Sequence, residues 1–112
     1  DGQGRVWFIP SDTDHALRLD LASGELTRFG DLSEWKNKWQ GGVLSHDGKF
    51  IYCVPCDAAQ VLRIETETGQ LALLGDLSEA KKKWQGGYSL DGRTIWCLPE
   101  SSERILRIAL PG

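Results

Sequence analysis

The sequence predicts an all-β protein that is made of repeated units of short antiparallel strands. Residues 30–42 (GDLSEWKNKWQGG) and 75–87 (GDLSEAKKKWQGG) are identical at eleven of thirteen positions and lie 45 residues apart. A fixed period of this size indicates a repeat architecture. Within each period, short apolar runs alternate with turn signals, which is typical of a sheet of short strands.

The complete middle unit contains four apolar runs, in the order GGVLS (41–45), FIYCVP (50–55), VLRIE (61–65) and LALLG (71–75). The first two are joined by Asp47-Gly48, a dipeptide that is favoured in tight hairpins, and Gly92 has the same place in the next unit. We expect both glycines to lie in turns where a side chain is costly. The last two runs are joined by a turn at Gly69.

Four antiparallel strands in about 45 residues make one blade of a β-propeller. The first strand of a blade lies near the central axis, and the glycine pairs at 41–42 and 86–87 fit that crowded place. The second strand is covered on both faces by neighbouring blades, and RVWFIP, FIYCVP and TIWCLP are accordingly apolar throughout. The sequence therefore predicts a partial β-propeller.

The two segments that connect the blades, DLSEWKNKW and DLSEAKKKW, carry helix signals. Asp31 and Asp76 can cap a helix N-terminus, each has a glutamate three residues on, and lysines follow in the last turn. This order of charges is the one that a helix dipole favours. We therefore predict short inter-blade helices, near 33–39 and 78–84.

A count of strands predicts that the two end units are incomplete. Residues 1–30 supply three strands but no first strand, 31–75 form a complete blade with its leading helix, and 76–112 supply a leading helix and three strands but no fourth. The total is ten strands, or about two and a half four-stranded antiparallel blades. The chain contains no methionine and opens on Asp1, so we expect a processed or excised chain.

An unclosed propeller of this size leaves two apolar blade faces and two sheet edges without cover. Copies of the chain, a larger protein partner or the rest of a longer chain would provide that cover. Each of these requires a protein–protein interface. We expect the partner to contact the outer faces of the first and third blades.

The bulk composition argues against several classes of partner. The chain has 112 residues, of which 40% are hydrophobic and 26% charged, with a net charge of −3, as in an ordinary soluble globular protein. This charge gives no electrostatic basis for binding nucleic acid. No apolar run reaches the roughly 18 residues that a transmembrane segment needs. The sequence does not indicate a compartment.

The sequence predicts no catalytic residues, no metal site and no cofactor. Two histidines and an odd number of cysteines make no set of metal ligands, and no Gly-x-Ser-x-Gly motif is present. Cys53 and Cys56 have the spacing of a redox pair, but they close a strand, where residues three apart point to opposite faces. We predict that they form no disulfide, that Cys53 and Cys97 pack in the core, and that Cys56 lies in a loop.

Aromatic residues between the blades form the candidate partner-binding site. It comprises three tryptophans and the lysines near them: Trp35, Trp39, Trp84, Lys36, Lys38 and Lys82. Trp39 and Trp84 recur in the repeat, and a repeated tryptophan usually fills the gap between blades. Trp35 is replaced by Ala80 in the next unit, so the fold does not require it. It is the better candidate for an interface anchor.

Two further sets of residues have two interpretations each. Three acidic residues follow the second strands: Asp12, Asp57 and Glu100. They either belong to a loop that binds a carbohydrate or a cation, or only stabilise the turns in which they lie. An arginine recurs in the third strands, at positions 18, 63 and 107. These arginines would either pair with a carboxylate of the next blade or form a ring of side chains that binds a ligand.

The repeat resembles those of known propellers. WQGGVLSHDGKFIYCVP and WQGGYSLDGRTIWCLP are similar to β-propeller repeats of protists and algae. GRVWFIP with ALRLDLASGELTRF resembles, more loosely, the repeats of streptogramin-lyase-like propellers. The resemblance covers nearly the whole chain and implies a propeller fold more than a function. The lyase-like enzymes depend on active-site histidines, whereas we expect His15 and His46 at opposite ends of their blades.

The sequence therefore favours a non-catalytic protein-binding or structural subunit of a larger assembly, which uses blade faces and loop-end aromatic residues. The alternative is a propeller that binds a small molecule or a carbohydrate, or acts as a lyase, once oligomerisation completes it. The residues favour a binding protein over an enzyme.

Overall fold

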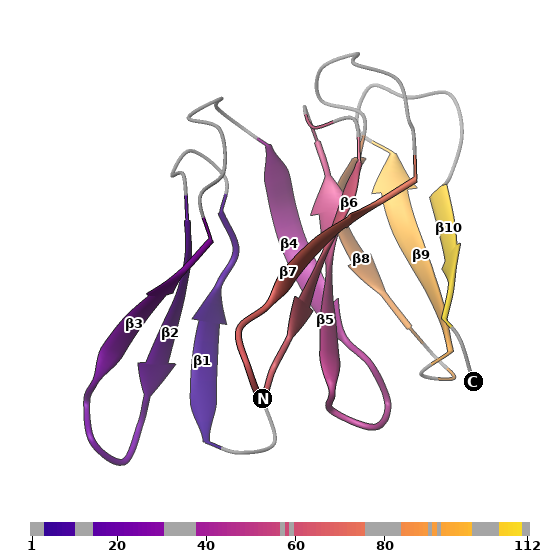
Figure 1. Cartoon of the computed structure of the whole chain (residues 1–112). Helices are drawn as coiled ribbons and strands as arrows, with labels where there is room; N and C mark the ends of the chain where they lie inside the picture. The colour runs from indigo at the N-terminus through magenta and orange to yellow at the C-terminus, as the bar shows by residue number, and fades with distance from the viewer. Residues whose placement is uncertain are drawn as a thin grey trace.

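The computed structural model describes residues 4–10, 15–30, 38–56, 58, 60–75, 84–89, 91, 93–99 and 106–110 (Figure 1). Ten strands lie in this part of the chain: β1 (Arg5–Phe8), β2 (Ala16–Asp20), β3 (Leu26–Phe29), β4 (Trp39–Leu44), β5 (Phe50–Pro55), β6 (Val61–Glu65), β7 (Leu71–Leu74), β8 (Trp84–Tyr88), β9 (Thr94–Pro99) and β10 (Leu106–Ala109). The predicted all-β fold is confirmed, with the predicted number of strands.

The strands form three antiparallel sheets that follow one another along the chain. We call β1-β2-β3 the first sheet, β4-β5-β6-β7 the middle sheet and β8-β9-β10 the third sheet. Figure 1 shows the middle sheet between the other two, with the β2–β3, β4–β5 and β6–β7 hairpin turns at one end of the molecule. Each sheet corresponds to one blade of the predicted partial propeller.

Strand β5 illustrates how an apolar sequence becomes buried on both sides. Consecutive side chains of a strand point to opposite faces of the sheet. Ile51 and Cys53 on one face, and Tyr52 and Val54 on the other, are at most 7% exposed. The FIYCVP run therefore suits a strand that lies between two neighbouring sheets, as the sequence predicted.

Glycines close several turns in a conformation that other residues rarely adopt. Gly24 and Gly69 both have φ of +76°, and the amide of each donates at 2.8 Å to the carbonyl of Asp20 or Glu65, respectively. Gly48 has φ of +75°, which confirms that it lies in a turn where a side chain is costly. Gly92 lies outside the described residues.

The inner strands β4 and β8 approach each other closely. A Cβ atom added to Gly41 would lie 3.0 Å from the Cα of Gly86, and one added to Gly42 would lie 2.9 Å from Ile9. A side chain at Gly41 would push the backbone of β8 away, and one at Gly42 would require the Ile9 side chain to move. The glycine pairs thus allow the close packing that was expected of strands near a propeller axis.

The predicted helices extend too far toward the C-terminus. Trp39 and Trp84 are strand residues, and their Cα partners are Pro55 and Pro99. At the first of these places, the carbonyl of Lys38 already accepts hydrogen bonds from two amides that follow β5. Long-range pairing therefore fixes the backbone here and overrides the local helix signals.

Residues 31–37 and 76–83, on which the rest of the predicted helices would fall, lie outside the described residues. In the part of the chain that the structure describes, no helix is long and apolar enough to cross a membrane.

Candidate functional site

Every sheet has two faces, and the register of its strands decides which side chains share one. We call the face toward the preceding sheet of the chain the N-side face, and the opposite one the C-side face. Both faces of the middle sheet pack against neighbours. The N-side face of the first sheet and the C-side face of the third sheet meet no other described sheet. We call these two the open faces.

At the first junction, the N-side face of the middle sheet packs against the first sheet. The core cluster there contains Ala16, Trp39, Ile51, Cys53, Leu62 and Ile64, and the partly buried Trp7 and Ile9 pack against it. Trp39 is 4% exposed, and its indole Nε1 donates a hydrogen bond of 2.7 Å to the backbone oxygen of Gln60. Its polar atom is thus satisfied while its ring fills the gap.

At the second junction, the C-side face of the middle sheet packs against the third sheet. The core cluster there consists of Tyr52, Val54, Val61, Trp84, Ile95 and Cys97. Trp84 is 8% exposed and has the place that Trp39 has in the first junction. The two junctions are therefore built from corresponding residues of successive repeats.

The open face of the first sheet is apolar apart from Arg28, which pairs with Leu17. Pairing of β2 with β1 and β3 places five hydrophobic side chains on it: Val6, Phe8, Leu17, Leu19 and Leu26. Phe8 is 47% exposed and Leu26 61%. Cys53, which has the place of Phe8 in the middle sheet, is 0% exposed. The first sheet thus presents to solvent the kind of face that the middle sheet buries.

The open face of the third sheet is aromatic and aliphatic. Strand pairing and alternation place Tyr88, Trp96, Leu98 and Arg107 on it. Trp96 is 39% exposed and Leu98 50%, whereas Tyr52 and Val54, at the same places in the middle sheet, are 2% and 0% exposed. The difference follows from the neighbour that each face has, because the residue types are alike.

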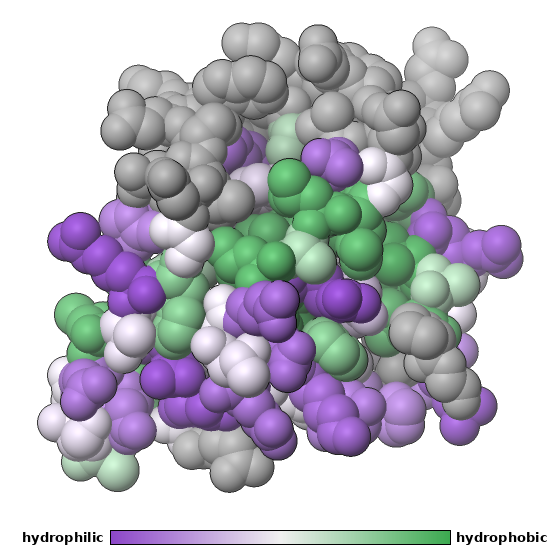
Figure 2. All heavy atoms as spheres, viewed as in Figure 1, coloured by the Kyte–Doolittle hydropathy of each residue, from purple (hydrophilic) through white to green (hydrophobic). Residues whose placement is uncertain are grey.

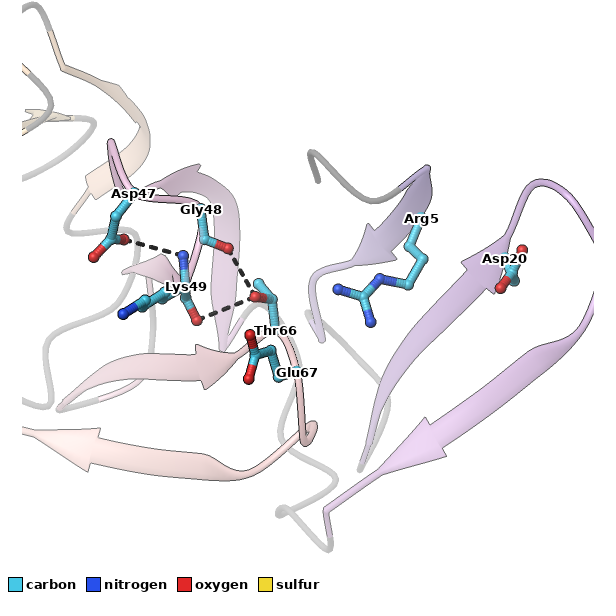
Figure 3. Close-up of a pocket in the computed structure, with 7 residues that line it drawn as sticks. All are labelled: Arg5, Asp20, Asp47, Gly48, Lys49, Thr66 and Glu67. Carbon is cyan, nitrogen blue, oxygen red and sulfur yellow. Dashed lines mark hydrogen bonds between the residues drawn. The ribbon is translucent and has the colours of Figure 1, made fainter.

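Hydrophilic residues gather elsewhere, at the end that carries the hairpin turns (Figures 1 and 2). A cleft of about 510 Å³ lies there between the first and middle sheets (Figure 3). Its lining residues are Arg5, Asp20, Asp47, Gly48, Lys49, Thr66 and Glu67. The basic Arg5 extends from the first sheet toward Thr66 and Glu67 of the middle sheet (Figure 3). Both signs of charge thus line the cleft.

Several polar groups of the cleft hold the β4–β5 turn together. The hydroxyl of Thr66 donates to the carbonyl of Gly48 at 2.7 Å. The carboxylate of Asp47 accepts from the hydroxyl of Ser45 at 2.6 Å and from the amide of Lys49 at 3.0 Å. These two bonds, that of Ser45 first, hold the pKa of Asp47 below its ordinary value. Asp47 and Thr66 therefore use hydrogen-bonding capacity within the protein that would otherwise face the cleft.

The first sheet also has an unpaired edge. The described residues give it no counterpart of the inner strands β4 and β8, so β1 is an edge strand. A recess of about 410 Å³ lies beside β1, between Val6 and Ile9 of the first sheet and Leu44 and Ile51 of the middle sheet. An edge strand beside an apolar recess is open to pairing with another chain.

Three of the candidate partner-binding residues lie in the interior. Trp39, Trp84 and Lys38 are 4%, 8% and 1% exposed, which agrees with the packing role that the repeat offered for the two tryptophans. As placed, they are not a surface for direct contact. The other candidates lie outside the described residues: Trp35, Lys36, Lys82, Asp12, Asp57 and Glu100.

Two of the recurring arginines stack on aromatic rings of their own sheet. The guanidinium of Arg18 lies 4.9 Å from the ring centre of Phe29 and 5.6 Å from that of Trp7, and the guanidinium of Arg63 lies 4.8 Å from the ring centre of Phe50. The sequence predicted that these arginines pair with a carboxylate of the next blade or surround a bound ligand. The contacts found are cation–π contacts, which stabilise an arginine that lies along a sheet face.

The cysteines Cys53, Cys56 and Cys97 are free and buried. Burial raises the pKa of the Cys97 thiol to about 12 and that of Cys53 further. A thiol with a raised pKa is a poor nucleophile near neutral pH, which agrees with the predicted packing role. Cys56, which the sequence placed in a loop, follows β5 but is only 1% exposed. Among the described residues, no three potential ligands gather into a metal site.

Comparison with known proteins gives a likeness in structure only. No family model matches the sequence, and no curated protein matches it. A streptogramin B lyase structure superimposes with a TM-score of 0.70 over 99% of this chain, at 12% sequence identity. A catalytically inactive virginiamycin B lyase from Staphylococcus aureus, in a structure with quinupristin, superimposes with a TM-score of 0.66 over 97% of the chain, at 16% identity.

The chain spans 39% of the length of each of these two proteins. At such low identity the likeness concerns the fold alone. Both neighbours are β-propellers, and the three successive antiparallel sheets of this chain correspond to part of one. The chain therefore has the fold of a partial β-propeller.

Proposed function

We propose that the chain is a non-catalytic, protein-binding or structural subunit of a larger assembly. The observation that carries this proposal is the exposure of apolar side chains on the open faces. Phe8 and Leu98 are 47% and 50% exposed, whereas their counterparts Cys53 and Val54 in the middle sheet are both 0% exposed. Soluble monomers rarely expose a large contiguous apolar patch, and such patches usually mark interfaces.

The open faces also have enough hydrophobic content to drive association. Complete burial of one large apolar side chain contributes about 1.5–3 kcal/mol relative to full exposure. Phe8, Leu26, Trp96 and Leu98 are each between 39% and 61% exposed. A partner that covers either face would recover part of this free energy at several positions. The unpaired edge of β1 offers backbone hydrogen bonds in addition.

The loop-end aromatic residues extend this proposal beyond the described residues. Trp35, with Lys36 and Lys82 near it in the predicted arrangement, would add an anchor to the apolar faces. Trp39, Trp84 and Lys38 would act indirectly, by holding neighbouring sheets together. We expect Trp35→Ala to weaken association by about 2 kcal/mol.

Sedimentation of the purified chain tests the proposal, with Phe8→Asp as the probe. We expect the parent chain to form particles heavier than its 12.5 kDa monomer and Phe8→Asp to weaken association at least tenfold. Leu21→Asp is the matched control, because Leu21 is 63% exposed but lies in the turn after β2. A parent chain that remains a stable, compact monomer would refute the proposal.

The second candidate is a lyase-like or ligand-binding propeller that is completed by oligomerisation. The observation in its favour is that both structural neighbours are lyases of streptogramin B type. Chromatography of quinupristin after incubation with the assembled chain tests it. A new product peak that disappears with Phe8→Asp would favour this candidate over a purely structural subunit.

A further inference from the structure

We infer that the open faces are complementary, and that the partner is a second copy of the chain, bound head to tail. The C-side face of the third sheet of one copy would pack on the N-side face of the first sheet of the other. This inference rests on the proposed function, which requires only that the open faces bind protein. It adds the identity of the partner and the pairing of the faces.

The two internal junctions provide the template for such a contact. In both, a C-side face that carries an aromatic residue and an aliphatic residue packs on an N-side face that carries aliphatic residues and a cysteine. At the first junction the C-side pair is Trp7 and Ile9, and at the second junction it is Tyr52 and Val54. The chain therefore contains this contact twice.

The open face of the third sheet has the features of a C-side face in these junctions. Trp96 and Leu98 have the places of Tyr52 and Val54 of the middle sheet. Arg107 pairs with Trp96 as Arg63 pairs with Tyr52. A surface that repeats the C-side residues of both internal junctions is expected to select an N-side face as its partner.

The open face of the first sheet has the features of an N-side face. Val6, Leu17 and Leu19 lie 45 residues before Ile51, Leu62 and Ile64, the aliphatic residues that the first junction buries. Phe8 departs from the pattern, because the corresponding residues Cys53 and Cys97 are smaller. The difference adds apolar area at the centre of this face, as an interface between separate copies requires.

The pairing of two different faces determines the form of the assembly. A head-to-tail contact closes into a ring of whole copies or continues as a filament. The described residues of each copy contribute three sheets, and propellers typically have about four to eight blades. Two copies, with six sheets, make the one closed ring in that range. We therefore expect a dimer of twice 12.5 kDa, held by two identical junctions.

A mixing experiment with one variant on each open face tests this arrangement. Phe8→Asp changes the first sheet, and Leu98→Asp changes the third sheet. In a head-to-tail dimer, either variant alone carries the change in both junctions, so we expect each to raise the dimer dissociation constant at least 100-fold. A mixture of the two has one unchanged junction, and we expect it to form a one-to-one heterodimer at least tenfold more tightly than either variant pairs with itself.

Circular dichroism of each variant, with Leu21→Asp as the control for an exposed leucine changed outside the open faces, checks that the sheets remain folded. Two results would show that like faces pair and would overturn the head-to-tail inference, while the proposed function would stand. One is a Leu98→Asp variant that dimerises as tightly as the parent chain. The other is a mixture whose heterodimer is no tighter than the dimers of the single variants. Native mass spectrometry that finds the parent chain only as a monomer would overturn both. Filaments in place of dimers would contradict the closed ring.

Discussion

The middle sheet and the two end sheets are made from the same repeat, but they differ in what covers them. Tyr52 and Cys53 face opposite sides of the middle sheet and are 2% and 0% exposed. Their counterparts at the open faces, Trp96 and Phe8, are 39% and 47% exposed. All four side chains are apolar or aromatic and the strand geometry is the same, so the neighbouring sheet accounts for most of the difference in burial, although Phe8 is larger than Cys53.

The repeated blade sequence is therefore suited to a sheet that has another sheet packed on each of its faces. A strand that is apolar on both faces gains its full hydrophobic stabilisation only when a sheet lies on either side. In the middle sheet both are present. In the end sheets one is missing among the described residues, and most of the residues on the face left open are still apolar. Variants at corresponding positions therefore report how much each neighbour contributes.

The largest contrast is expected between Leu62→Ala and Leu17→Ala, at corresponding positions 45 residues apart. Leu62 is 0% exposed within the first junction, so its truncation should lower the free energy of unfolding by about 2–5 kcal/mol. Leu17 is partly exposed on the open face, and its truncation should cost roughly 1 kcal/mol.

Urea denaturation at a protein concentration low enough to keep the chain monomeric measures both losses. Equal losses would show that the open face is covered even in the monomer. A rise in the cost of Leu17→Ala with protein concentration would indicate instead that association buries this residue.

A smaller contrast is expected between two turn glycines. Gly69 and Gly24 have the same φ of +76°, but an added Cβ would collide with the ring of Phe29 at Gly69 and would meet nothing within 4 Å at Gly24. Gly24→Ala should therefore cost about 1 kcal/mol, from backbone strain alone. Gly69→Ala should cost about 2–3 kcal/mol, because the ring of the neighbouring sheet must also move.

Thermal unfolding of the two variants gives the difference. Gly48→Val, in a turn with φ of +75° and free space around it, should fall near Gly24→Ala, at about 1 kcal/mol or more. Similar losses for Gly69→Ala and Gly24→Ala would mean that the first and middle sheets are not in firm contact at this turn.

The strands and turns could be predicted because their signals are local. Alternation, glycine positions and the 45-residue period determine which segments extend and where they turn. The limits of the helical segments could not be predicted, because Trp39 pairs with Pro55, a contact that no local window contains. The order of charges predicts where a helix begins, but pairing with a distant strand determines where the helical segment ends.

The candidate site was predicted only in outline. A strand count predicted two open faces, but the residues on them, such as Phe8 and Trp96, depend on register, which an alignment of the repeats at their offset could have supplied. Arg18 could not be assigned a partner, because a carboxylate and an aromatic ring suit an arginine on a sheet face equally well. Its partner Phe29 lies diagonally across the strand pair.

The smallest effect expected is a difference between two corresponding turn carboxylates, Asp47 of the middle sheet and Asp91 of the third. The pKa of each lies below the ordinary value of an aspartate, about 3.9. For Asp47 the main cause is the hydroxyl of Ser45, whereas for Asp91 it is the amide of Arg93. A lowered pKa stabilises the folded state above the ordinary pKa, and this contribution is lost as the pH falls through the lowered value.

Replacement of the two serines should therefore separate the two turns. Ser45→Ala removes the donor that lies 2.6 Å from Asp47, so the pKa of Asp47 should rise toward its ordinary value and less stability should be lost on acidification. Ser89→Ala removes a donor 3.4 Å from Asp91, while the amides of Arg93 and Thr94 at 2.8 and 2.9 Å remain. The pKa of Asp91 should then change little. Titration of the two carboxyl groups by NMR measures both shifts, and equal shifts would mean that the side-chain bond, rather than the backbone of the turn, controls both carboxylates.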